Sequence, residues 1–124
     1  MDNISPKLQN QIAQFQQLQQ QLQNVLSQKF RMEAQQKELE MTIEELKKAT
    51  QETPIYKNVG SLMIAVKDKD ALLKEMEDDK ETVEVRVKTL DRQEKMFREK
   101  YQVMQDQISK ALGQAPVRAE EDEN

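Results

Sequence analysis

The sequence has no cysteine, histidine or tryptophan, and only two glycines and three prolines. Without cysteine and histidine, the chain has no disulfide, no thiol nucleophile, no histidine base and no ordinary zinc site. The scarcity of glycine and proline excludes a turn-rich β protein. Aromatic residues make up 4% of the 124 residues and charged residues 34%, so apolar material for a thick globular core is lacking. Abundant Gln, Glu, Lys and Leu favour long helices instead.

Several other classes of function are also disfavoured. No run of about 18 apolar residues exists to span a membrane, and the N-terminus lacks the features of a signal peptide. With cysteine absent, we expect a reducing, cytoplasmic location. Lys and Arg are interleaved with acids at a net charge of −4, which argues against nucleic-acid binding. Adjacent acids such as Glu44-Glu45 point about 100° apart on a helix and make no ligand pair. We predict no enzyme, no metal and no cofactor.

The rare prolines and glycines divide the chain. Ser5-Pro6 predicts a helix start, and Pro54 ends that helix because the residue before proline avoids α geometry. The β-branched segment around Gly60 predicts a hairpin, and Asp68 or Asp70 caps a second helix. We expect one domain over 1–124, with a helix at 5–49, a β-hairpin at 55–67, a helix at 69–112 and a disordered acidic tail at 113–124.

Apolar residues recur at alternating spacings of three and four in both predicted helices, which is typical of a coiled-coil seam. In the first helix the seam positions are Leu8, Gln11, Phe15, Leu18, Leu22, Val25, Lys29, Met32, Gln36, Leu39, Ile43 and Leu46. In the second they are Leu73, Met76, Lys80, Val83, Val87, Leu90, Glu94, Phe97, Tyr101, Met104, Ile108 and Ala111.

Folding the chain between the two helices pairs these positions as antiparallel layers, from Leu46 with Leu73 to Leu8 with Ala111. Seven layers are apolar on both sides, and no layer is polar on both sides. Lys29 and Glu94 occupy adjacent layers and are predicted to form an ion pair that sets the register; if exposed, it contributes under about 1 kcal/mol. The termini are then expected together, away from the hairpin. The alternative is pairing of these helices with other chains.

The predicted hairpin requires partners. Two strands alone are marginally stable in water, and its second strand is apolar on both faces. We therefore expect an oligomer organised by β pairing, unless the segment is a loose connector packing against the helices.

The open end of the helical pair carries apolar residues outside the seam, namely Ile4, Ile12, Val103 and Leu112. Helix ends fray, and methionine repacks readily, so this end offers a small adaptable apolar surface. Ordinary scattered surface residues are the equally simple interpretation. Ten glutamines between positions 9 and 28 are interpreted as exposed helix formers.

The segment Ile55-Tyr56-Lys57-Asn58-Val59-Gly60-Ser61-Leu62-Met63-Ile64, between a Gln-rich helix and one carrying Leu90-Asp91-Arg92-Gln93-Glu94, resembles the β-type subunits of the prefoldin family, archaeal ones above all. The short connection leaves room for one hairpin, as in that type. The resemblance implies a mainly α fold, a long two-helix coiled coil whose hairpins pair between subunits into β-barrels. It also implies a hexamer of two α-type and four β-type subunits.

The resemblance further implies an ATP-independent chaperone that captures unfolded polypeptides at the coiled-coil tips and transfers them to a group II chaperonin. By position, the tip residues are Ile4, Leu8, Ile12, Phe15, Met104, Ile108 and Leu112. The resemblance also implies an assembly surface that comprises Tyr56, Val59, Leu62, Met63, Ile64 and Val66. The acidic tail is predicted to steer docking, so deleting residues 118–124 should slow transfer more at low salt than at high salt. The competing hypotheses are a structural tether or adaptor, and a subunit of a prefoldin-like complex without client capture.

Overall fold

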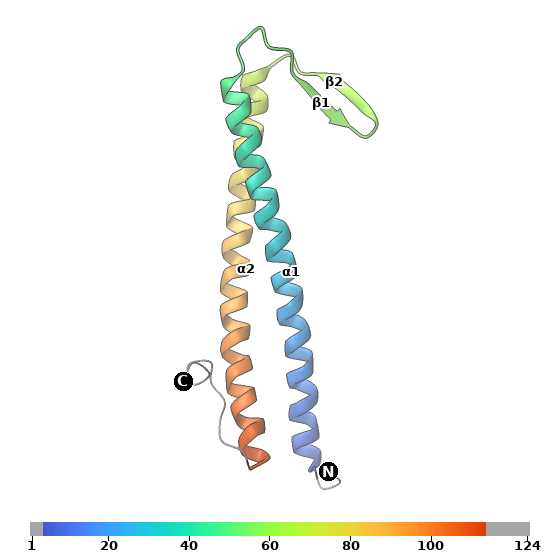
Figure 1. The fold of residues 1–124 in the computed structure, drawn as a ribbon, viewed down its shortest axis with the longest axis vertical. Helices are drawn as coiled ribbons and strands as arrows, with labels where there is room; N and C mark the ends of the chain where they lie inside the picture. The colour runs from blue at the N-terminus through green and yellow to red at the C-terminus, as the bar shows by residue number, and fades with distance from the viewer. Residues whose placement is uncertain (1–3, 114–124) are drawn as a thin grey trace. The chain divides into compact units, whose positions relative to one another are not determined.

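The computed structural model describes residues 4–113, which form two long helices with a small hairpin between them (Figure 1). Helix α1 spans Pro6–Lys48, strands β1 and β2 span Tyr56–Val59 and Leu62–Ala65, and helix α2 spans Lys69–Ala111. This is the mainly α class with one inserted hairpin that the sequence predicts. From residue 114 on, the predicted acidic tail lies outside the described residues.

Local capping residues set the ends of both helices. Ser5 Oγ accepts a hydrogen bond from Leu8 N at 3.1 Å, and Pro6 is the first helical residue. Asp68 Oδ1 accepts from Ala71 N at 3.0 Å, so Asp68 rather than Asp70 caps α2. Helix α2 ends before Gly113, whose φ of +81° is the left-handed conformation that glycine adopts after a helix.

The chain forms two compact units. The first combines the chain up to Lys29 with the chain from Thr89 onward, and the second is Phe30–Lys88. In each unit a part of α1 lies beside a part of α2 (Figure 1). The rings of Phe15 and Tyr101, with centroids 4.7 Å apart, join the helices in the first unit.

The core of each unit follows the predicted seam. Of the 24 seam positions, 23 are buried or half-buried, and every buried apolar residue among the described residues lies on the seam. Ala111 is the exception, since it is exposed. It is the last residue of α2 and presents only a methyl group, so the helix ends before this layer closes. The buried apolar residues are Leu8, Leu18, Val25, Ile43, Leu46, Val83 and Leu90.

The hairpin is closed by a two-residue turn. The antiparallel register pairs Tyr56 with Ala65 and Val59 with Leu62, which leaves Gly60 and Ser61 as the turn. Gly60 has a φ of +61°, and no residue other than glycine has a positive φ in the described chain. A positive φ at the first turn position alone fits a type II′ turn, whose twist matches that of the strands.

Candidate functional site: the exposed hairpin and the helix ends

The hairpin presents apolar side chains to solvent on both faces. All eight strand residues are exposed. Among the large apolar ones, the largest exposed fractions are those of Met63 (69%), Leu62 (63%) and Tyr56 (57%). The register places Val59, Leu62 and Ile64 on one face together with Lys57. Tyr56 and Met63 lie on the other face with Asn58 and Ala65. Five of the six predicted assembly residues are therefore exposed, and Val66 is half-buried.

Two grooves adjoin the hairpin. The first, of about 390 Å³, lies between the Val59 and Ile64 face and the first turns of α2, including Leu72. The second, of about 470 Å³, is lined mainly by apolar groups that include Tyr56, Leu46 and Met76. Both edges of the two-stranded sheet are unpaired within residues 4–113, where β1 pairs only with β2. The hairpin thus offers two apolar faces and two strand edges.

The connections that carry the hairpin are held by polar contacts. Lys69 Nζ donates a hydrogen bond to the carbonyl oxygen of Ala49, at the end of α1. Thr53 Oγ1 accepts from Thr50 N at 3.0 Å, and Thr53 N donates to the Thr50 carbonyl at 3.1 Å. Val66 N donates to the Ile55 carbonyl at 2.8 Å, which extends the pairing beyond the strands.

The predicted tip residues are mostly sheltered, in contrast to the hairpin. Leu8 is buried, and only Leu112 is exposed, at 48%. Leu8 and Leu112 both belong to the first unit, as do the half-buried tip residues Ile4, Ile12, Phe15, Met104 and Ile108. Ile12 lies beside the seam rather than on it, so the apolar strip of α1 is wider here than the strict seam. Ile4 lies before α1 begins at Pro6.

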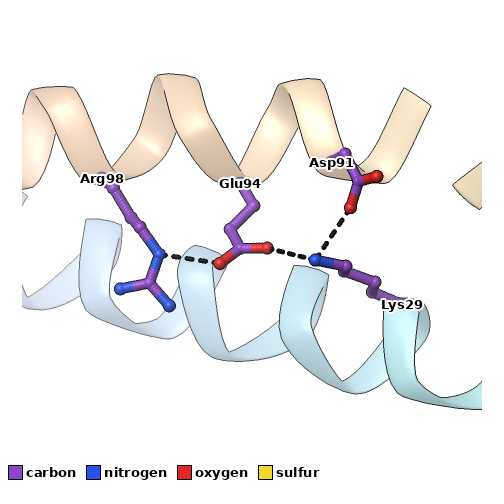
Figure 2. A network of polar contacts seen from close by, with 4 residues as sticks. All are labelled: Lys29, Asp91, Glu94 and Arg98. Atoms are coloured by element: carbon purple, nitrogen blue, oxygen red, sulfur yellow. Dashed lines mark hydrogen bonds and ion pairs between the residues drawn. The ribbon is translucent and has the colours of Figure 1, made fainter. Parts of the chain in front are cut away.

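A charged cluster interrupts the seam of the first unit. Lys29 Nζ lies 2.8 Å from Asp91 Oδ1 and 2.8 Å from Glu94 Oε1, and Arg98 Nε lies 2.7 Å from Glu94 Oε2 (Figure 2). The predicted pair of Lys29 with Glu94 is confirmed. Sequence reasoning missed Asp91 and Arg98 because they lie off the seam, although Arg98 follows Glu94 by four residues on the same helix face.

These contacts shift the titration of both central groups. Hydrogen bonds from Lys29 and then Arg98 hold the pKa of Glu94 below its usual range. Hydrogen bonds to Asp91 and then Glu94 raise the pKa of Lys29. Both groups are therefore held in their charged forms.

Within residues 4–113, no group of three or more acidic side chains is arranged to hold a metal ion. Over the same residues, neither helix has the length of apolar sequence needed to cross a membrane. The distinctive features of the described chain are thus its exposed apolar hairpin and its interrupted seam.

Comparison with known proteins identifies the family. Residues 9–115 match the family described as prefoldin subunit. The chain belongs to the prefoldin family. It is 44% identical to prefoldin subunit beta of Archaeoglobus fulgidus over 90% of this chain and 96% of that protein. It is 43% identical to prefoldin subunit beta of Pyrobaculum neutrophilum over 98% and 95%. The crystal structure of the prefoldin beta subunit from Thermococcus strain KS-1 matches with a TM-score of 0.77 and 36% identity, over 90% and 97% of the two chains.

The resemblance to β-type prefoldin subunits is thereby confirmed. As a prefoldin, the chain is a chaperone subunit that works in a complex with other subunits. Its family is not a known enzyme family.

Proposed function

We propose that this chain is a subunit of an ATP-independent holdase, which captures unfolded polypeptides at the ends of its helices and transfers them to a group II chaperonin. In this proposal the complex contains two α-type and four β-type subunits and acts in the cytoplasm. The hairpin supplies the contacts between subunits, and the helix ends supply the contacts to clients.

The exposed hairpin is the observation that carries the proposal. Large side chains such as Leu62 and Met63 are more than 60% exposed although they are apolar. Exposed apolar patches beside open strand edges mark interaction surfaces. Strands from other subunits would pair with both edges and cover both faces, including the grooves beside α2 and beside Tyr56. A loose connector packed on the helices would instead have buried these residues.

The helix ends fit a weak, adaptable client site. Most of their apolar residues are half-buried in the chain alone, although Leu8 is buried and Leu112 is exposed. Small local movements therefore expose more apolar surface without unfolding the unit. Met104 and Ile108 add side chains that repack around varied partners. Several such ends in one complex raise the effective concentration of sites, so each contact can stay weak and reversible.

The experiment that tests client capture compares charged substitutions at two places in the full complex. Leu8→Glu combined with Ile108→Glu places charge in the end of the first unit and should abolish suppression of client aggregation. The matched control is Phe30→Glu combined with Met41→Glu, which places the same charges on exposed apolar residues of α1 in the second unit. The control complex should capture clients normally.

Assembly and folding are measured alongside, by light scattering and by circular dichroism. Loss of capture with an intact complex supports the holdase. Full capture by the Leu8→Glu and Ile108→Glu complex favours a structural tether, which binds one partner through a fixed face. Transfer is then tested by adding a group II chaperonin to the client complex and following client release. Release at the spontaneous rate would contradict that part of the proposal.

A further inference from the structure

The charged cluster occupies two positions of a mainly apolar seam. Lys29 and Glu94 are seam residues whose side chains are only 24% and 15% exposed, and their seam neighbours Val25 and Leu90 are buried. Replacing partly buried ion pairs by packed apolar side chains is often neutral or stabilising. Stability alone therefore gives no reason for this cluster. Single polar seam residues are known instead to select the register of coiled coils.

The apolar pattern by itself selects the register only weakly. In the observed register, seven seam layers are apolar on both sides. Sliding one helix along the other by one heptad leaves six such layers in one direction and five in the other. Heptad repeats make such shifted pairings geometrically acceptable. The apolar layers alone therefore favour the observed register only slightly over the two shifted ones.

The contacts of the charged cluster distinguish the observed register from both shifted registers. If Lys29 moves from Leu90 to Phe97, Arg98 and Tyr101 take the positions of Asp91 and Glu94. The ammonium then faces a guanidinium. If Lys29 moves to Val83 instead, Glu84 and Val87 take those positions, so one of the two carboxylates is lost. In both shifts Glu94 loses its cation on α1, because Gln36 or Leu22 takes the position of Lys29.

We infer that Lys29, Asp91, Glu94 and Arg98 form a register lock, which fixes the pairing of α1 with α2 at a cost in seam packing. Three of its contacts, each 2.7–2.8 Å long, are satisfied together in the observed register. A slip of one heptad would displace the helices by about 10 Å and misalign Leu8 and Phe15 with Met104 and Ile108. The lock therefore sets which tip residues lie together.

The natural absence of cysteine allows a direct test in the full chain. Gln19 Nε2 lies 3.5 Å from the Tyr101 hydroxyl, so Gln19→Cys with Tyr101→Cys reports the observed register. Leu26→Cys with Tyr101→Cys reports the shifted register in which Lys29 faces Phe97. Ile12→Cys with Tyr101→Cys reports the opposite shift, in which Lys29 faces Val83. A short bis-maleimide cross-linker is applied to each pair, and the yield of cross-linked monomer is measured by mass spectrometry.

In the native background the Gln19 pair should dominate. In Lys29→Leu with Glu94→Leu, the yield of the two shifted pairs relative to the Gln19 pair should rise at least threefold. Gln11→Leu is the matched control, since it also makes a polar seam position apolar but leaves the cluster intact. No rise in the double variant, or an equal rise in Gln11→Leu, would overturn the lock.

A second variant keeps the test decisive if the double variant does not fold. Lys29→Glu repels Asp91 and Glu94 in the observed register but attracts Arg98 in the register that the Leu26 pair reports. Cross-linking of the Leu26 pair should therefore rise at least threefold above that of the Ile12 pair. Equal yields of the two shifted pairs would contradict the lock.

Discussion

The seam and the hairpin use similar apolar residues for opposite purposes. Leu18 on the seam is 5% exposed, whereas Leu62 on the hairpin is 63% exposed. The seam residues find their partners within the chain, so they drive folding of the chain itself. The hairpin residues find none within the described chain, so their apolar area becomes available only on association. Apolar character alone does not show whether a residue supports folding or association. What decides is whether another helix or strand of the described chain covers its side chain.

The largest predicted effect comes from placing charged side chains on the hairpin. Leu62→Asp with Ile64→Asp places two carboxylates on one exposed face, where association would bury them without partners. We expect complete loss of the complex by light scattering, with the thermal unfolding midpoint of the isolated chain changed by no more than about 2 °C. A single change on an exposed helix face, Met41→Asp, should leave assembly intact. A complex that survived the double change would place the subunit interface elsewhere.

Truncating a leucine in each region should separate folding from association. Leu18→Ala removes a buried side chain and should lower the free energy of unfolding by about 2–5 kcal/mol. Leu62→Ala should lower that of the isolated chain by less than about 0.5 kcal/mol. Urea unfolding followed by circular dichroism measures both. Equal losses would mean that the hairpin is packed within the chain.

A substitution in the hairpin turn should affect association but not the folding of the helices. Gly60 has a φ of +61° and open space around its Cα, so an added methyl group meets no neighbour and acts only through the backbone. Gly60→Ala should therefore disfavour the turn by about 1 kcal/mol. Because only the hairpin depends on this turn, complex formation should weaken by about fivefold for each subunit interface while helix unfolding stays unchanged. Ser61→Ala, at the next turn position, is the control and should have little effect on either.

The smallest predicted effect concerns pH and tests the polar part of the seam. The pKa of Glu94 is lowered on folding, so its contribution to stability is present above the ordinary carboxyl pKa and is lost as pH falls through the lowered value. The stability difference between the native chain and Glu94→Gln should be largest near about pH 7 and should vanish near about pH 2. Urea midpoints across this range measure it. Glu99→Gln, on an exposed part of α2, is the control for the loss of one carboxylate from the same helix.

Most of the fold could be predicted because it depends on local signals. Ser5, Asp68 and Gly113 act on the helix ends next to them, and the heptad pattern marks the buried seam. Ala111 was predicted wrongly, because a repeat does not reveal where the last layer lacks a neighbour. Asp91 and Arg98 were missed for a different reason, since their role depends on the direction in which Lys29 extends across the helix pair.

The candidate site was less predictable than the fold. Sequence pattern identified the apolar residues of the hairpin, and the structure shows five of the six exposed. The heptad pattern places Leu8 on the seam and Leu112 outside it, in agreement with the buried Leu8 and the exposed Leu112. It could not show that Ile4 and Ile12, which also lie outside the seam, are half-buried. The grooves beside the hairpin also depend on how Leu72 and Met76 lie against Tyr56 and Ile64, which no local pattern specifies. The roles of these residues in assembly and capture stay predictions.

The bond from Lys69 to the Ala49 carbonyl has a consequence for the thermodynamics of association. It joins the end of α1 to the start of α2 and so closes the segment between them into a short loop. Such closure removes conformations from that segment before any partner arrives. Because binding partners must otherwise supply that ordering entropy, the hairpin is preorganised, and more of its apolar area contributes to affinity.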